Sequence, residues 1–84
     1  MPEAPKWISF QLEERANGKK TDVWNVWSTG GAHHLGRVAW FGLWRKYAFF
    51  PAPATIYDPE CLRDLAMFVE VQTEAHRKGK RAAP

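Results

Sequence analysis

Apolar and polar side chains alternate over residues 7–15, which is the period of a strand with one face on a core. The apolar members of this alternation are Ile8, Phe10 and Leu12, and the polar members are Ser9, Gln11 and Glu13. Asn17-Gly18 follows and favours a hairpin, because both central positions of a type I′ turn need a positive φ.

A second strand is predicted over residues 22–29, where apolar groups occupy both faces. Trp24 and Val26 fall on one face, and Val23, Asn25 and Trp27 fall on the other. Apolar groups on both faces are expected of a central strand or of one that is covered on both sides. Gly30-Gly31 then predicts another turn.

The densest run of aromatic residues, 40–51, predicts a hairpin around Gly42. Its first strand runs from about His34 to Phe41 and its second from about Trp44 to Phe50. Pro51 ends the second strand, because proline cannot donate to a ladder. Which face of the second strand meets the core stays open, since a one-residue slip exchanges the two. The alternatives are Arg45, Tyr47 and Phe49, or Lys46, Ala48 and Phe50.

The hydrophobic period becomes helical after residue 58. Asp58 is predicted as the N-cap, Pro59 suits the first helical position, and Glu60 complements the helix dipole. Apolar residues then recur at helical spacing, namely Leu62, Leu65, Ala66, Phe68 and Val69. Gly79 is predicted to end the helix.

These elements predict an α+β fold, a four-stranded antiparallel β-meander followed by one C-terminal helix packed on one face. We expect a single domain over residues 1–79, with residues 1–5 flexible and residues 80–84 as a disordered basic tail. The predicted core face of the sheet holds Ile8, Phe10, Leu12, Trp24, Val26, Val38 and Trp40. The predicted opposite face shows Ser9, Asn25, Trp27, Arg37 and Ala39.

The composition fits one small domain with a thin core. Of the 84 residues, 45% are hydrophobic and five are tryptophan, so we expect a second surface to be buried by another copy of the chain. No apolar run reaches the ~20 residues of a membrane helix, and residues 1–5 do not resemble a signal peptide. Cys61 is the one cysteine, which indicates a reducing, cytoplasmic setting.

The net charge of +3 lies at the C-terminus. Residues 76–84 hold four Lys or Arg residues and no acid, and the remaining chain holds eight cations and nine acids. A basic isoelectric point therefore gives little support to nucleic-acid binding by the folded body. Within that body, residues 22–50 hold three cations and one acid, whereas residues 58–75 hold one cation and five acids.

Three short stretches resemble a family of small proteins encoded by tailed phages and prophages. They are Leu35-Gly36-Arg37-Val38-Ala39-Trp40, then Trp44-Arg45-Lys46-Tyr47-Ala48-Phe49-Phe50-Pro51, and Asp58-Pro59-Glu60-Cys61-Leu62. The resemblance covers roughly residues 24–70, and the N-terminal strand departs from it most. Small phage proteins of this kind include sponges that sequester cyclic-nucleotide signals of bacterial immunity. The resemblance therefore implies a sponge acting in the cytoplasm of a bacterial host.

Aromatic and cationic residues on the sheet are the candidate ligand-binding set. Trp44 and Arg45 adjoin the predicted turn, Arg37 lies one strand away, and Trp27 faces away from the helix. Tyr47 completes the set, which is Trp27, Arg37, Trp44, Arg45 and Tyr47. An indole or phenol stacks on a base for ~1–3 kcal/mol, and arginine binds phosphate. The alternatives are that these arginines are solvated and that the tryptophans form subunit contacts.

Neither metal binding nor catalysis is predicted. His33-His34 are adjacent strand residues that point to opposite faces, so they cannot both ligate one ion. Cys61 is expected to fill the core, although the first helical turn favours a thiolate. No Ser-His-Asp set, carboxylate pair or phosphate-binding glycine loop is present, so we expect no enzyme and no cofactor.

Three functions follow from these observations. The first is a non-catalytic sponge for a cyclic di- or trinucleotide, acting as a homo-oligomer. The second is a module that binds a phage or host protein through its aromatic sheet face. The third is a small nucleic-acid-binding domain, which the charge distribution argues against.

Overall fold

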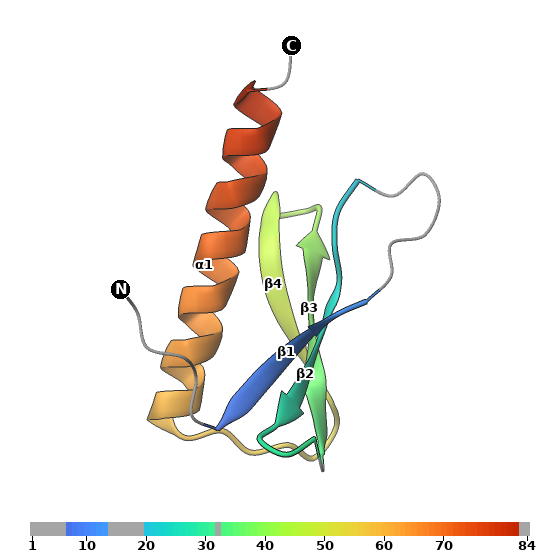
Figure 1. The fold of residues 1–84 in the computed structure, drawn as a ribbon, viewed down its shortest axis with the longest axis vertical. Coiled ribbons are helices and arrows are strands. Elements are labelled where there is room, and N and C mark those ends of the chain that lie inside the picture. The colour runs from blue at the N-terminus through green and yellow to red at the C-terminus, as the bar shows by residue number, and fades with distance from the viewer. Residues whose placement is uncertain (1–6, 14–19, 32, 83–84) are drawn as a thin grey trace.

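The fold is an antiparallel sheet followed by one long helix, as the sequence predicts. The computed structural model describes residues 7–13, 20–31 and 33–82. Its elements are β1 (Ile8–Leu12), β2 (Trp24–Ser28), β3 (His34–Phe41), β4 (Lys46–Pro51) and α1 (Pro59–Ala82). The strands lie in the order β1-β2-β3-β4, and each pairs antiparallel with the next. Figure 1 shows α1 on one side of this sheet. The predicted α+β fold is therefore confirmed.

The turns explain how the strands follow one another. Gly30 and Gly31 have φ of 91° and 74°, which are values that glycine adopts without steric cost, so the predicted turn before β3 is confirmed. Residues 42–45 form the turn between β3 and β4. The predicted Asn17-Gly18 hairpin turn and the flexible residues 1–5 lie outside the described residues.

The core is a layer of side chains between the sheet and α1. Its buried members are Ile8, Val26, Val38, Tyr47 and Leu65. Aromatic rings surround them: Phe10 stacks on Phe68 with centroids 3.8 Å apart, and Trp24 and Trp40 meet Tyr47 edge-on at 5.4 and 5.3 Å. Such pairs add ~0.5–1.5 kcal/mol beyond the area that they bury.

The sheet register decides which face of β4 meets the helix. Trp40, a core residue, pairs with Tyr47, and Val38 pairs with Phe49. Paired residues share a face, so Tyr47 and Phe49 face α1, while Lys46, Ala48 and Phe50 face away. The structure thus selects between the two alternatives that the sequence left open.

Leu12 is a correction to the predicted core. It is on the core face, opposite Trp24, but 59% of it is exposed. Leu12 is the last residue of β1, which is one edge strand, and α1 packs mainly against β4, which is the opposite edge strand. The helix therefore does not cover the end of β1.

The start of α1 follows the prediction, but its inward face is turned slightly. The Cys61 N–H donates to Asp58 Oδ1 at 2.8 Å, which confirms Asp58 as the N-cap. Leu65, Phe68 and Val69 pack on the core, whereas Leu62 is 53% exposed and Ala66 is also exposed. The inward residues also include Cys61, Thr73 and His76. Cys61 is four residues before Leu65, Thr73 is four residues after Val69 and His76 is three residues after Thr73, so they follow one helix face.

The predicted end of the helix at Gly79 is also corrected. The helix continues through Gly79 to Ala82, so residues 80–82 of the predicted disordered tail are helical. A glycine inside a helix costs about 1 kcal/mol relative to alanine but keeps its N–H for the i−4 carbonyl. The neighbouring lysine and arginine residues are good helix formers, and they offset this cost.

Candidate binding surface on the open sheet face

The face of the sheet that points away from α1 is here called the outer face. No element of the described part of the chain packs on it (Figure 1). Period-two alternation and the strand register place its members as Ser9, Gln11, Asn25, Trp27, His34, Arg37, Ala39, Phe41, Lys46, Ala48 and Phe50. None of these residues is acidic.

One end of the outer face carries a row of rings beside an arginine. The Arg37 guanidinium carbon lies 5.8 Å from the centroid of the Phe50 ring, within the range of a cation–π contact. Phe50 meets Phe41 at 6.2 Å, and Phe41 meets Trp44 edge-on at 4.7 Å. The Trp44 side chain is 62% exposed, so its ring is available as a stacking surface.

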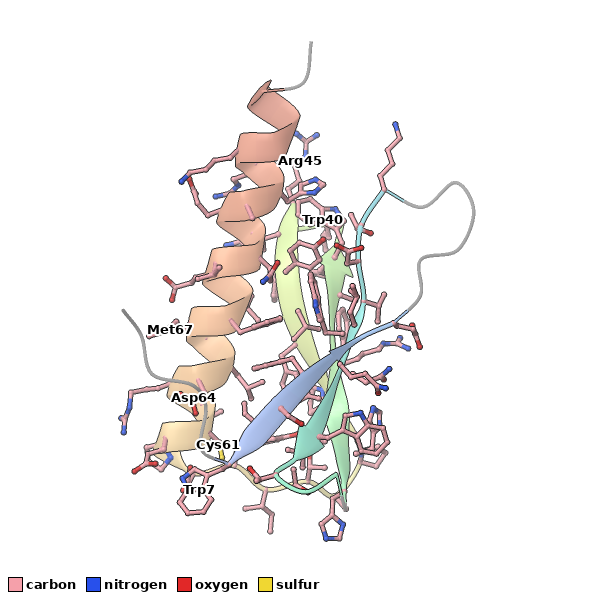
Figure 2. The ribbon with its side chains drawn as sticks, viewed as in Figure 1. Trp7, Trp40, Arg45, Cys61, Asp64 and Met67 are labelled. Atoms are coloured by element: carbon pink, nitrogen blue, oxygen red, sulfur yellow. The ribbon has the colours of Figure 1, made fainter. Side chains whose placement is uncertain are left out.

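The loop between β3 and β4 positions Trp44 and Arg45 at the end of this row. The Trp44 N–H donates to the Phe41 carbonyl and the Arg45 N–H to the Gly42 carbonyl, both at 3.2 Å. Arg45 has a φ of 55°, in the left-handed region that costs a non-glycine residue ~1–2 kcal/mol. The Arg45 side chain is exposed in this tight loop (Figure 2).

Trp27 lies in a second cluster on the outer face. Its Nε1–H donates to Gln11 Oε1 at 3.0 Å, and its ring lies 4.9 Å from the His34 ring. His34 Nε2 is in turn 3.1 Å from Asn25 Oδ1. These contacts fix the indole beside a shallow hollow lined by Ser9, Gln11, Trp27 and Gly31.

Tyr47 does not belong to this surface, which corrects the predicted set. It is 4% exposed and lies on the core face between Trp24 and Trp40. Its hydroxyl accepts the Asp22 N–H at 3.1 Å, and its own N–H donates to Thr73 Oγ1 at 3.0 Å. Tyr47 therefore has a structural role.

The remaining four predicted residues lie on the outer face or on the loop beside it, but in two groups. Trp44 and Arg45 adjoin the ring row that Arg37 borders, whereas Trp27 contacts Gln11 and His34. Sequence reasoning missed Phe41 and Phe50. Alternation from Arg37 along β3 could have identified Phe41, whereas Phe50 could be identified only when the face of β4 is known.

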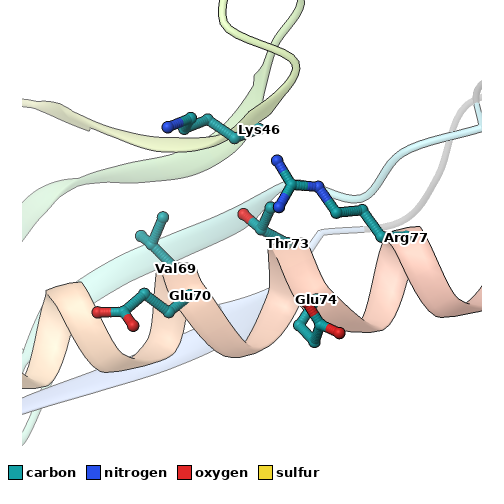
Figure 3. A pocket seen from close by; sticks show the side chains of 6 residues that line it. All are labelled: Lys46, Val69, Glu70, Thr73, Glu74 and Arg77. Carbon is teal, nitrogen blue, oxygen red and sulfur yellow. The ribbon is translucent and has the colours of Figure 1, made fainter.

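A narrow groove between β4 and α1 is lined by charges of both signs (Figure 3). Its residues are Lys46, Val69, Glu70, Thr73, Glu74 and Arg77, and its volume is about 260 Å³. Lys46 borders both the groove and the outer face, because β4 is the edge strand beside α1. The Thr73 hydroxyl accepts the Tyr47 N–H, and Thr73 is one of the residues that line the groove. Balanced charges give the groove no preference for an anion or a cation.

Cys61 has the environment of a structural thiol. Burial against the core raises its pKa, and a hydrogen bond with Asp58 adds to this. A raised pKa leaves less thiolate, which is the reactive form. Among the described residues, no group of three or more His, Cys, Asp or Glu side chains is placed to hold a metal ion.

The fold and this surface together define a small α+β protein with an open sheet face that carries aromatic rings and cations. In sequence, the chain is similar to an uncharacterized 9.3 kDa protein of Acholeplasma phage L2. The two are 30% identical over 61 residues, which cover 73% of this chain and 78% of the phage protein. The chain therefore belongs to a family of phage proteins that includes this one, and the predicted kinship with phage proteins is confirmed at this level.

Other comparisons add no further relative. No protein-family profile matches the chain, and no solved structure matches it significantly. The part of the chain that the structure describes contains no helix long and apolar enough to cross a membrane.

Proposed function

We propose that this protein is a non-catalytic phage protein that sequesters a cyclic di- or trinucleotide immune signal in the bacterial host cytoplasm. The observation that carries the proposal is the combination of Arg37 with the rings of Phe50, Phe41 and Trp44 on an uncovered sheet face. Small phage proteins of similar size and origin include sponges of this kind, and the proposal extends that role to this chain by analogy.

A nucleotide ligand suits this surface because its bases and its phosphates need different partners, and the surface offers both. Its flat bases stack on aromatic rings, each for ~1–3 kcal/mol, and its phosphates pair with arginine. Arg37 supplies a cation at the Phe50 end of the ring row, and Arg45 follows Trp44 in the loop at the other end. The outer face has no acidic member to repel phosphate.

A cyclic di- or trinucleotide is the form of nucleotide that fits best. Its bases and phosphates are held in a compact ring, so binding orders few torsions and loses little entropy. The row and the Trp27 cluster offer several stacking positions on one continuous sheet. Sequestration needs only binding and no catalytic group.

A specific observation also favours the second candidate, a protein-interaction module. Leu43 is 82% exposed at the tip of the β3–β4 loop, next to the exposed Trp44. Exposed apolar side chains that adjoin one another are typical of protein contacts, and tryptophan is enriched among residues that dominate binding energy. The two candidates use overlapping residues and differ in the ligand.

Isothermal titration calorimetry with a panel of cyclic di- and trinucleotides tests the proposal. We expect the wild type to bind at least one of them at micromolar concentration. Arg37→Ala should weaken binding by ~10-fold or more, since a charge-assisted contact contributes about 1.5–3 kcal/mol. Arg63→Ala is the matched control, because Arg63 is exposed on α1 and the affinity should not change.

Two outcomes contradict the proposal in different ways. If no cyclic di- or trinucleotide binds below millimolar concentration, the protein-interaction candidate takes its place. If a single-stranded oligonucleotide binds instead, and a chain ending at Lys78 loses most of that affinity, the basic C-terminus acts as a nucleic-acid contact. A steep salt dependence would accompany that second result.

A further inference from the structure

The two edges of the sheet are built differently, and the difference begins with the hydrogen-bond alternation of β1. The Thr29 N–H donates to the Trp7 carbonyl at 2.9 Å, and the Glu13 N–H donates to the Val23 carbonyl at 2.8 Å. In an antiparallel pair, alternate residues bond to the partner strand and the others point away from it. The N–H and C=O groups of Ile8, Phe10 and Leu12 therefore point outward from the edge.

The edge at β4 is protected by the chain itself at two of its three outward residues, Tyr47 and Pro51. The Ala52 N–H donates to the Leu35 carbonyl at 2.8 Å, so the same alternation turns the N–H of Tyr47 outward, and this group donates to Thr73 Oγ1 on α1. Pro51 is also an outward position, and proline has no N–H to leave unpaired. A covering helix and a terminal proline are two common protections of an edge strand.

The edge at β1 has neither protection. Its outward N–H and C=O groups have no hydrogen-bond partner among the described residues. Charged side chains and proline normally keep an edge strand from pairing with another strand. The five residues of β1, Ile-Ser-Phe-Gln-Leu, include neither. In Figure 1, β1 is the strand nearest the viewer, and no ribbon of the described chain passes in front of it.

We propose that β1 pairs antiparallel with β1 of a second copy of this chain, forming one eight-stranded sheet across a two-fold axis. The register that pairs all three outward residues places the axis at Phe10, opposite Phe10 of the second copy. Ile8 is then opposite Leu12 of the second copy. This contact is isologous, the commonest kind in homodimers.

The chemistry of β1 is self-complementary in this register. On the core face, Leu12 meets the apolar Ile8 of the second copy and loses exposed apolar area. On the outer face, Ser9 is opposite Gln11 of the second copy, so polar residues meet polar residues. Both copies of α1 lie on the same side of the joined sheet, and each packs mainly against its own β4, away from the junction.

The pairing does not depend on the identity of any ligand. It joins the two outer faces into one surface and brings the hollows beside Gln11 next to each other. The copies are held together by backbone hydrogen bonds rather than by a large apolar contact. Each copy contributes six groups, the N–H and C=O of Ile8, Phe10 and Leu12. A solitary edge without this partner would leave those groups to water.

Light scattering coupled to size-exclusion chromatography tests the proposal with a matched pair of variants. The protein concentration should range from about 1 to about 100 micromolar, because dimerisation depends on concentration. We expect the mass of two chains for the wild type. Leu12→Lys should shift the mass to one chain, because the two copies would place charge at the pairing edge. Leu62→Lys changes an equally exposed leucine on α1 and should keep the mass of two chains.

A disulfide experiment tests the register itself, in a Cys61→Ala background. Ser9 and Gln11 of the second copy would form a non-hydrogen-bonded pair with Cα atoms ~4.5 Å apart, within the range that a disulfide bridges. Mixing Ser9→Cys protein with Gln11→Cys protein should give a linked pair of chains under mild oxidation. Each variant alone should give much less of it.

Two results overturn the proposal. One is a wild-type mass of a single chain at every concentration. The other is a dimer that survives Leu12→Lys and gives no mixed disulfide, since the copies would then meet at a different surface. Circular dichroism of each variant distinguishes loss of pairing from loss of the fold, because only the latter removes the strand and helix signal.

Discussion

The two faces of the sheet come from the same strands but have opposite environments. The β3–β4 hairpin gives Trp40, Tyr47 and Phe49 to the core, and it gives Arg37 and Phe50 to the outer face. Both sets are rich in aromatic rings, so composition does not distinguish them. The helix does, because it covers one face and excludes water there. Similar side chains therefore stabilise the fold on one face and remain available for binding on the other.

The strongest test of this contrast removes a large side chain from the covered face. Leu65→Ala should lower the free energy of unfolding by ~2–5 kcal/mol, because Leu65 is buried and its removal leaves a cavity. Chemical denaturation measures the change. Leu62→Ala, at an exposed position of the same helix, should cost well under 1 kcal/mol. Equal losses for the two variants would mean that α1 does not pack as described.

A smaller loss of stability is expected when a side chain is added at Gly36, where the packing of the covered face leaves no space for it. A Cβ on Gly36 would lie 2.4 Å from the Phe50 carbonyl oxygen and 2.9 Å from the Phe49 ring. Gly36 also has a φ of 150°, a backbone conformation that residues with a side chain rarely adopt. Gly36→Ala should therefore cost about 1–3 kcal/mol or more, through overpacking and backbone strain together, measured by denaturation. Gly42→Ala is the control, since nothing lies within 4 Å of the added atom, and its stability should be nearly unchanged. A neutral Gly36→Ala would contradict the close contact between β3 and β4.

The smallest effect is expected at the helix start, outside both faces. Hydrogen bonds from the backbone N–H and the thiol of Cys61 hold the pKa of Asp58 below its ordinary value, because they stabilise the carboxylate. A lowered folded-state pKa contributes stability at pH values above the ordinary pKa, and this stability is lost as the pH falls through the folded value. We expect Asp58→Ala to melt at a lower temperature than the wild type at neutral pH, by an amount that shrinks below about pH 4.

Asp58→Asn separates the cap from its charge. Asparagine also caps helices well but does not titrate, so its melting temperature at neutral pH should lie between those of the wild type and Asp58→Ala. A difference between the wild type and Asp58→Ala that stays constant from pH 7 to pH 2 would rule out the charged cap. Melting curves followed by circular dichroism provide the measurement.

The sequence by itself determined the four strands, the helix start and the grouping of residues by face. Those features depend on local rules: side chains alternate along a strand, and Asp58-Pro59 satisfies the first turn of a helix. Local rules state which residues share a side, such as Tyr47 with Phe49. They do not state which side meets the core, because that depends on a partner distant in sequence.

The tertiary structure alone decided the remaining features, since they depend on where α1 lies. Pairing with β3 turned Tyr47 toward the helix and Phe50 away from it, which moved one residue out of the candidate surface and added another. The helix covers β4 but not the end of β1, so Leu12 is exposed although its alternation is that of a core residue. The same placement closes one edge of the sheet through Thr73 and leaves the other open. Burial is a property of the whole arrangement, whereas periodicity is a property of a few consecutive residues.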